Sequence, residues 1–361
     1  MIKSKFAPIV LLLTFILFFP VWVQAADIQL SPDGTIPGTP FEQLQAQIDA
    51  LTGRVDALEV ENVEQAGYIS TLQAQVADLQ SGAAALAVIF DGVHRTDNDI
   101  FFDEVNVHIR NGLGETDGVQ DGEFTILGEV NGLGNLIIGY NEERPEEEAV
   151  NDKTGSHNLV VGPQHNYPSF GGLVAGGKNT ISGILSTVSG GFENTANGII
   201  SSVTGGEDNE ASNTGSSVTG GQGNSASGKE SSVTGGEANK ASGEASSVIG
   251  GNGNTASGQR ASVTGGFANT ASGGSSSISG GFLNTASGGS SSISGGHSNT
   301  ASGQASGVTG GQANKAIGND SSVSGGFVNT ASGEISSVSG GSGRSAPNLV
   351  DWAAGSLFED H

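Results

Sequence analysis

The stretch SVTGGFANTASGGSS, residues 262–276, is followed directly by SISGGFLNTASGGSS, residues 277–291, and this fifteen-residue repeat decides the fold. A pair of adjacent glycines keeps the same period without a slip from Gly190 to Gly340. A strict period indicates that each repeat is a structural unit that stacks on its neighbours. Residues 171–341 therefore predict a solenoid, and a flexible Gly/Ser-rich linker is the minor alternative.

Three further columns of residues keep step with the glycine pairs. A β-branched residue lies two positions before each pair, an asparagine lies three positions after it, and an alanine follows the asparagine by two. Members of these columns include Val203, Val218, Val233, Val263, Asn209, Asn224, Asn269, Ala211, Ala226 and Ala271, with the glycines Gly205, Gly206, Gly265 and Gly266. Because side chains alternate along a strand, we expect the Val, Ala and Asn columns inside and the intervening Ser and Thr columns outside. Stacked Asn side chains would then hydrogen-bond from rung to rung.

The fold class that these columns predict is all-β: a parallel β-roll, or β-solenoid, with turns of about fifteen residues. Each turn has two short strand-like pieces, such as Ser-Ser-Val-Thr and Asn-Thr-Ala-Ser, joined by glycines that permit positive φ. One valine and one alanine per turn make a thin core. We therefore expect the roll to gain stability by packing against copies of itself.

Residues 41–80 carry a heptad pattern that predicts an α-helical coiled coil before the roll. With Phe41 at position a, the a positions are Phe41, Ile48, Val55, Asn62, Ile69 and Val76, and the d positions are Leu44, Leu51, Leu58, Gln65, Leu72 and Leu79. β-branched residues at a with leucine at d favour two strands, and the polar layers at Asn62 and Gln65 would fix the register. A single amphipathic helix docked on a neighbouring domain is the alternative.

The N-terminus has the pattern of a secretory signal peptide. Lys3 and Lys5 precede an apolar run over residues 6–23, and Val23-Gln24-Ala25 offers a cleavage site. An uncleaved membrane anchor is the alternative, and export to the exterior, the cell surface or the periplasm follows in either case. We divide the chain into a signal peptide (1–25), a linker (26–40), a coiled coil (41–80), irregular early β turns with an acidic insertion loop (81–170), the β-roll (171–341) and a C-terminal cap (342–361).

Composition and charge exclude several classes of function. The formal net charge is −24, and residues 26–170 hold 25 acidic against 5 basic side chains. This balance argues against nucleic acid and against anionic lipid as partners, so we expect neither, and no membrane contact once the signal is removed. The chain has no cysteine, which excludes disulfides, thiolate zinc sites, cysteine nucleophiles and a lipidated cysteine.

Motifs that carry chemistry are not found in the sequence. The six histidines, His94, His108, His157, His165, His297 and His361, have no metal-ligand spacing, and neither a nucleophile elbow nor a P-loop occurs. Two acidic groups, the first formed by Asp97, Asp99, Asp103 and Glu104 and the second by the loop Glu142–Glu148, could hold calcium, but solvated insertions are favoured. We predict no enzymatic activity, no cofactor and no metal.

The repeat columns resemble the head repeats of YadA-like trimeric autotransporter adhesins, also called Hep/Hag repeats. The likeness is carried by segments such as Ser262–Gly266 and Asn269–Gly273, and Val105–Gly112, Asn135–Gly139 and Asn158–Gly162 look like degenerate early turns. The resemblance implies a left-handed parallel β-roll, a homotrimer in preference to a dimer, and binding to host matrix or other surfaces. The family repeat is nearer fourteen residues, and its stalk usually follows its head. We expect no C-terminal membrane anchor of the family's kind.

Two functions follow as expectations. The first is an exported structural or adhesin-like protein of the bacterial cell envelope or exterior, which acts through an uncharged Ser/Thr/Asn-rich surface toward a matrix or glycan. The alternative is an ice- or polysaccharide-binding solenoid, because an outward Thr/Ser column runs from Ser189 through Thr204 to Ser339 with one interruption at Ile249. An enzyme such as a pectin-cleaving β-helix is a third possibility, but the acidic or basic cluster that such an enzyme requires is lacking.

Overall fold

The structure is a computed structural model that describes residues 40–89, 91–119, 123–125, 128–145 and 151–355. It forms two compact units, Met1–Asn106 and Val107–His361, which are described separately below. The predicted signal peptide and the linker up to residue 39 lie outside the described residues.

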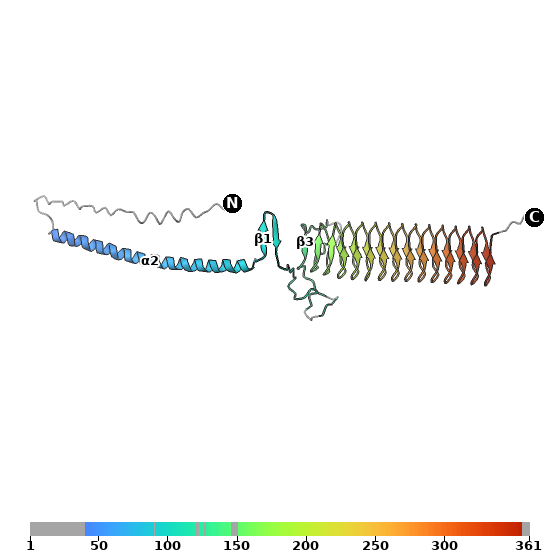
Figure 1. Cartoon of the computed structure of the whole chain (residues 1–361), viewed down its shortest axis with the longest axis horizontal. Coiled ribbons are helices and arrows are strands. Elements are labelled where there is room, and N and C mark those ends of the chain that lie inside the picture. Colours follow the sequence, from blue (N-terminus) through green and yellow to red (C-terminus); the bar gives the residue numbers. More distant parts are fainter. Residues whose placement is uncertain (1–39, 90, 120–122, 126–127, 146–150, 356–361) are drawn as a thin grey trace, which may run out of the picture. The chain divides into compact units, whose positions relative to one another are not determined.

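A single long helix, α2 (Pro40–Ile89), dominates the first unit (Figure 1). Proline suits its first position, because the N–H that proline lacks would have no partner in the first turn of a helix. The helix is confirmed and runs nine residues beyond the predicted end at residue 80. Ala83, Ala84 and Ala85 favour this extension because alanine has the highest helix propensity.

A β-hairpin completes the described part of the first unit. Strands β1 (Val93–Thr96) and β2 (Asp99–Phe102) pair antiparallel, with Thr96 opposite Asp99. Asp97 in the two-residue turn has φ of 53°, as a tight hairpin turn requires. The His94 ring stacks on Phe101 at 4.9 Å between centroids, and its Nδ1 lies 3.0 Å from an Asp103 carboxylate oxygen.

The second unit contains two parallel sheets that together form the roll (Figure 1). The fifteen-stranded sheet consists of β3 (Leu136–Ile138), β4 (Leu159–Val161), β5 (Leu173–Ala175), β7 (Thr187–Val188), β9 (Ser202–Val203), β11 (Ser217–Val218), β13 (Ser232–Val233), β15 (Ser247–Val248), β17 (Ser262–Val263), β19 (Ser277–Ile278), β21 (Ser292–Ile293), β23 (Gly307–Val308), β25 (Ser322–Val323), β27 (Ser337–Val338) and β29 (Trp352–Ala353). The twelve-stranded sheet consists of β6 (Thr180–Ile181), β8 (Thr195–Ala196), β10 (Glu210–Ala211), β12 (Ser225–Ala226), β14 (Lys240–Ala241), β16 (Thr255–Ala256), β18 (Thr270–Ala271), β20 (Thr285–Ala286), β22 (Thr300–Ala301), β24 (Lys315–Ala316), β26 (Thr330–Ala331) and β28 (Ser345–Ala346).

The register confirms a parallel β-solenoid with turns of about fifteen residues. Val218 pairs with Val233 in one sheet, and Ala211 pairs with Ala226 in the other. Single-residue bridges form a third ladder along one edge, for example between Phe267 and Phe282. The roll continues into the segment for which the sequence predicts a cap, because β28 and β29 add another turn in register.

The early turns differ from the regular ones. The predicted turns at 135–139 and 158–162 contain β3 and β4, but Val105–Gly112 forms no strand. The partner of Leu136 is Leu159, so an insertion loop fits between these two strands. Arg144 fastens this loop to the roll, because its Nε donates to the carbonyl of Gln164 at 2.9 Å and its guanidinium donates to Thr180 Oγ1 at 2.9 Å.

The core of the roll confirms the predicted inward columns of Val, Ala and Asn, whose members from Val188 to Val338 are almost fully buried. A fourth inward column, which was not predicted from the sequence, holds the first serine of each Ser-Ser-Val-Thr segment, such as Ser216 and Ser231. Strand alternation explains it, because this serine lies two residues before the buried valine. The core is therefore half polar and more demanding of hydrogen-bond partners than a purely apolar core.

The asparagine column is satisfied mainly by backbone groups and less by the side-chain ladder that the sequence predicts. Asn224 Oδ1 accepts from the N–H of Asn239 at 2.9 Å, and Asn224 Nδ2 donates to the carbonyls of Gly220 and Gly236, both at 2.9 Å. Among the described turns, a direct amide-to-amide bond between asparagines occurs at Asn269 and at Asn284. Each carboxamide therefore fixes the backbone of its own turn and of the next.

Glycines have two distinct roles in the turns. Gly206, the second of its pair, has φ of 88°, as predicted. Gly228 instead has no room for a side chain, because an added Cβ would lie 2.0 Å from the carbonyl oxygen of Gly243 in the next turn. The remaining left-handed positions are filled mostly by other residues, including the β-branched Val328 and Ile335 with φ of 56° and 60°. The prediction that glycines supply the positive φ values is thus only partly correct.

Candidate functional site

The outer face of the twelve-stranded sheet carries a regular array of hydroxyl groups. Over four successive turns, threonine precedes the buried alanine and serine follows it; the residues are Thr255, Thr270, Thr285 and Thr300, with Ser257, Ser272, Ser287 and Ser302. The threonines are half-buried and the serines are exposed. Neighbouring rungs lie about 4.8 Å apart, and the two columns lie about 6.6 Å apart along the strand. The array is interrupted by Glu210, Lys240 and Lys315.

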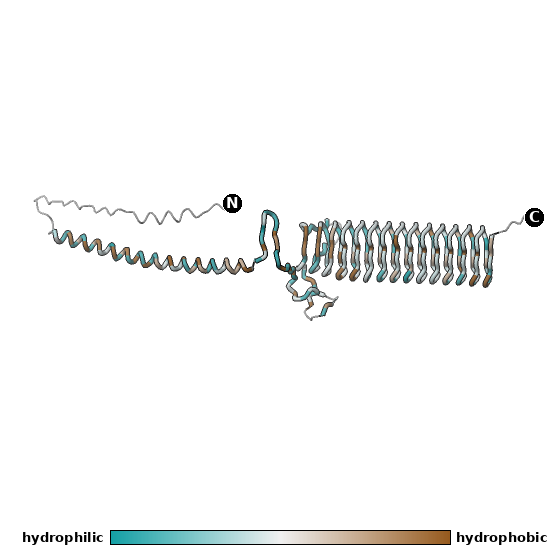
Figure 2. Tube along the Cα trace, in the orientation of Figure 1, coloured by the Kyte–Doolittle hydropathy of each residue, from teal (hydrophilic) through white to brown (hydrophobic). Residues whose placement is uncertain are grey.

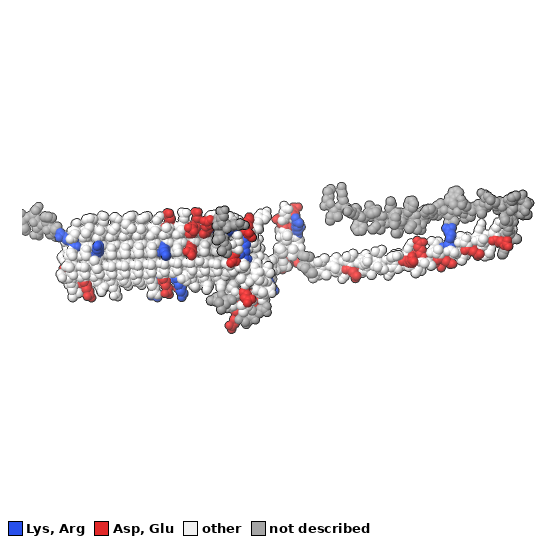
Figure 3. All heavy atoms as spheres, turned by 180° about the vertical axis from the view of Figure 1, so that it is seen from behind, with Lys and Arg blue, Asp and Glu red and all other residues white. Residues whose placement is uncertain are grey.

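The outer face of the fifteen-stranded sheet has the same character. A column of serines runs beside a column of threonines and serines, and both flank the buried valines; examples are Ser217, Ser232, Ser262, Thr204, Thr219, Thr234 and Thr264. The outward Thr/Ser column predicted from Ser189 to Ser339 is indeed exposed, with Ile249 as its one apolar member. Figure 3 shows that few charged side chains lie on the visible face of the roll.

An aromatic ladder along one edge of the roll was not singled out from the sequence. The rings of Phe267 and Phe282 stack at 5.1 Å between centroids, and His297 follows Phe282 at 5.0 Å. Phe192 and Phe327 occupy the same column and are also exposed. The signal that could have revealed the ladder is the recurrence of phenylalanine two positions after the first glycine of a pair.

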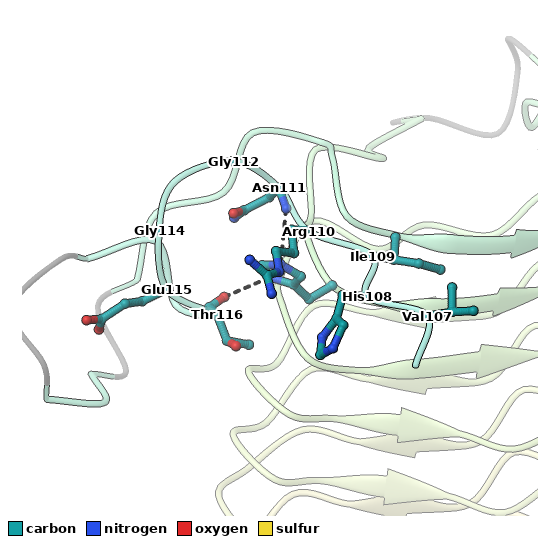
Figure 4. A pocket seen from close by; sticks show the side chains of 10 residues that line it. Val107, His108, Ile109, Arg110, Asn111, Gly112, Gly114, Glu115 and Thr116 are labelled. Atoms are coloured by element: carbon teal, nitrogen blue, oxygen red, sulfur yellow. Dashed lines mark hydrogen bonds between the residues drawn. The ribbon is translucent and has the colours of Figure 1, made fainter. Parts of the chain in front are cut away.

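A pocket of about 550 Å³ lies before the first turn of the roll and is bounded by residues 107–112, 114–116 and 157 (Figure 4). His157 supports its wall. The N–H of Asn111 donates to His157 Nε2 at 3.2 Å, and His157 Nδ1 donates to the carbonyl of Thr116 at 2.9 Å. Both ring nitrogens therefore serve to hold the loop, with Nε2 as the acceptor and Nδ1 as the donor.

His165 takes part in the asparagine ladder. Its Nδ1 accepts from the N–H of Asn179 at 3.2 Å, and its Nε2 donates to the carbonyl of Val161 at 3.0 Å. Burial lowers the pKa of His165, because the imidazolium would lose its hydration, and the positive charge of Arg144 acts in the same direction. Its hydrogen bond to Val161 opposes this shift only in part.

Asp117 organises the loop after the pocket. Its carboxylate accepts from the N–H of Thr125 at 2.7 Å and from the N–H of Val119 at 3.2 Å. The first of these hydrogen bonds is the main reason why the pKa of Asp117 lies below its usual value, although burial acts against it. The carboxylate of this aspartate thus has a structural role, because it accepts hydrogen bonds from two backbone N–H groups of the loop.

The other histidine and acidic side chains that the sequence singled out do not come together at one site. No group of three or more His, Asp or Glu side chains in the described ranges is arranged to hold a metal ion, so Asp97, Asp99, Asp103 and Glu104 form no such site. The last part of the second acidic group, residues 146–148, lies outside the described residues, as does His361. His94 belongs to the hairpin, and His108 lines the pocket.

These observations define the class of protein: a parallel β-solenoid repeat protein with a long N-terminal helix. Comparison with models of known protein families gives no match, and neither does a search of curated proteins. Within the part of the chain that the structure describes, no helix is both long enough and apolar enough to cross a bilayer.

Proposed function

We propose that this chain is an exported, non-enzymatic repeat protein that associates with copies of itself and binds a surface, a matrix or a glycan through the outer faces of its roll. The observation that carries the proposal is the pair of hydroxyl arrays on the two sheets, of which the array on the fifteen-stranded sheet has no charged member. The likeness of the repeats to YadA-like adhesin heads supports the adhesive role. The signal pattern over residues 1–25 supports export.

The hydroxyl arrays suit adhesion for a physical reason. Each turn repeats the same donors and acceptors at a spacing of about 4.8 Å, so a polymeric ligand can engage several turns at once. Threonine is stiff at χ1, and its hydroxyl therefore loses little freedom when a ligand binds. Many weak contacts then add up without a deep pocket.

Self-association is proposed through α2. The a and d residues from Leu44 onward are exposed on the single helix; Leu51, Leu58, Leu72 and Leu79 are 55–72% accessible to solvent. The heptad assignment also extends past residue 80, because Ala83 and Leu86 fall at a and d. An apolar stripe of this length is stable in water when other helices cover it. A trimer is favoured over a dimer because of the likeness to adhesin heads.

Binding of the mature chain, residues 26–361, to immobilised matrix proteins and glycans tests the adhesive role. A variant with Thr255, Thr270, Thr285 and Thr300 all changed to valine keeps the shape but removes four hydroxyls, and we expect it to lose most of the binding. The matched control changes the same four residues to serine, which keeps the hydroxyls, and should still bind. Equal binding by both variants and the natural chain, or no binding to any surface, would contradict the proposal.

A second candidate function is binding to ice or to an ordered polysaccharide. It is favoured by the unbroken Thr-x-Ser array over Thr255–Ser302, whose two spacings form a flat lattice. Thermal hysteresis measured with the mature chain tests ice binding, and co-sedimentation with insoluble polysaccharides tests the other. Hysteresis that disappears in the four-valine variant would favour this function over adhesion.

A further inference from the structure

The first three strands of the fifteen-stranded sheet have an apolar outer face, unlike the strands that follow. The side chains on this face are Leu136 and Ile138 of β3, Leu159 and Val161 of β4, and Leu173 and Ala175 of β5, here called the apolar patch. They are exposed or half-buried, and Ile138 is 55% accessible. Figure 2 shows the change from hydrophobic to mixed colouring after the first strands.

The roll does not need these side chains for its own core. The inward residues of the same strands are Val160 and Val174, which are fully buried. In the column that contains Leu159 and Leu173, the next strands carry Thr187 and then serines. Hydroxyl residues fill this column in the later turns, so the fold of the roll does not require leucine at these outward positions. A clustered exposed apolar face is typical of an interaction site.

Two further apolar side chains are exposed at the start of the roll. Ile137 occupies the inward column, in line with Val160, yet it is 37% accessible, because no strand of the second sheet faces β3. Leu133, just before β3, is 59% accessible. Ile137 and Leu133 thus add exposed apolar side chains within β3 and just before it.

We propose that the apolar patch is the place where the rolls of two copies of this chain touch, and that the contact between rolls is confined to it. The hydroxyl faces of the later turns then stay free for ligand. This inference rests on the proposed self-association through α2, and it adds where the rolls meet and where they do not.

A second copy is the occupant that the charges favour. The chain carries a net charge of −24, so two copies repel each other at long range, chiefly through residues 26–170, which hold 25 acidic against 5 basic side chains. No residue of the apolar patch is charged, and identical patches therefore meet without like-charge repulsion. The Ser/Thr faces carry few charged residues, but their hydroxyls are well hydrated and gain little from burial against each other.

Tethering strengthens the same conclusion. When α2 of one copy associates with α2 of another, the two apolar patches are held on the same assembly at a high effective concentration. A patch too small to drive association by itself then becomes buried. An unrelated partner would have no such advantage.

Site-specific cross-linking of the mature chain tests the inference, and the absence of native cysteine gives a clean background. Leu159→Cys places a thiol in the patch. Ser232→Cys places one in the same column, four strands beyond β5. After treatment with a flexible bismaleimide, we expect covalent dimers from Leu159→Cys and at least fivefold fewer from Ser232→Cys.

A second pair of variants separates packing from folding. Leu159→Ser with Leu173→Ser installs residues that later turns already carry, so the roll should still fold. Combined with Ile138→Cys, this change should reduce cross-linking at least fivefold, whereas Ser232→Ala with Ser247→Ala should leave it unchanged.

The alternative outcomes are distinguishable by light scattering on the same samples. Efficient cross-linking at both positions would overturn the confinement, because the rolls would then touch along their length. Assembled chains that fail to cross-link at Leu159→Cys would overturn the contact while leaving association through α2 intact. A monomeric mass without cross-links would overturn both.

Discussion

His165 Nδ1 accepts a hydrogen bond from the backbone N–H of Asn179 at 3.2 Å, and in the later turns an asparagine Oδ1 holds the equivalent place. The imidazole also takes the donor role that the Nδ2 of an asparagine has in later turns. Its Nε2 donates to the carbonyl four residues back, at Val161, as Asn224 Nδ2 does to Gly220. Within the described residues, the ladder that holds the regular turns together therefore begins on a titratable side chain.

The first prediction concerns acid sensitivity. The pKa of His165 lies below its usual value of 6.5 in the folded chain, chiefly because of burial. The unfolded chain therefore takes up a proton first as the pH falls, and folding stability is lost below about pH 6.5. Thermal unfolding at about pH 7.5 and pH 5.5 should show a larger drop for the natural chain than for His165→Asn, which keeps the acceptor and the donor. Equal drops would refute the role of His165.

The second prediction concerns the asparagine column. Asn224→Ala leaves the buried N–H of Asn239 without its acceptor and removes two donors from glycine carbonyls. Each buried group left unpaired costs about 1–3 kcal/mol, so we expect a loss of roughly 2–4 kcal/mol in the free energy of unfolding. Urea denaturation measures it. The control is Ser225→Ala, at the next residue, whose side chain points outward; its free energy of unfolding should stay within about 0.5 kcal/mol of the natural chain. A loss there as large as that of Asn224→Ala would count against the role of the asparagine ladder.

The third prediction concerns backbone strain at a left-handed position. Val328 has φ of 56°, and Gly223 occupies the same place in another turn with φ of 63°. A β-branched residue in this region costs about 1–2 kcal/mol. Val328→Gly should therefore raise the thermal midpoint, and Gly223→Val should lower it. A Cβ at Gly223 meets nothing within 4 Å, so a steric clash cannot account for the second effect. Shifts of the opposite sign would show that side-chain packing outweighs the strain.

The fourth prediction concerns association through α2. Leu58 at position d and Val60 at position f are both exposed on the single helix, at 55% and 62%. Leu58→Glu places one charge from every helix in a single layer of the coiled coil and should shift the light-scattering mass toward the monomer, because a buried charge without a partner is costly. Val60→Glu lies on the outer side and should keep the mass of the natural chain. If both variants assemble equally well, the helices do not associate in this register.

Much of the fold could be predicted from the sequence. The fifteen-residue period, the valine and alanine columns and the heptads of α2 each follow from local spacing alone. The candidate surface was visible in the same way, because an outward column such as Thr204 and Thr219 is fixed once the valines are placed inside. The buried serine column exemplified by Ser231 was available from the same alternation, but serine alone gave no reason to place it inside.

Other features depend on contacts between residues far apart in the sequence. The role of His165 requires Asn179 in the next turn, and the crowding at Gly228 arises only because Gly243 stacks directly on it. Val105–Gly112 has alternating apolar residues like a strand, yet it has no strand partner in the described part of the chain. Its pattern could not reveal this, because a parallel strand exists only where another strand offers its hydrogen bonds.

The sequence by itself determined the repeat, the helix and three of the four inward columns, because a strict period constrains every turn to the same conformation. The tertiary structure decided which carbonyl each asparagine binds, which glycines are needed for space and which for φ, and that leucines of β3–β5 lie outside the core. These are properties of one turn stacked on another, and they exist only once the rungs are brought to their common spacing.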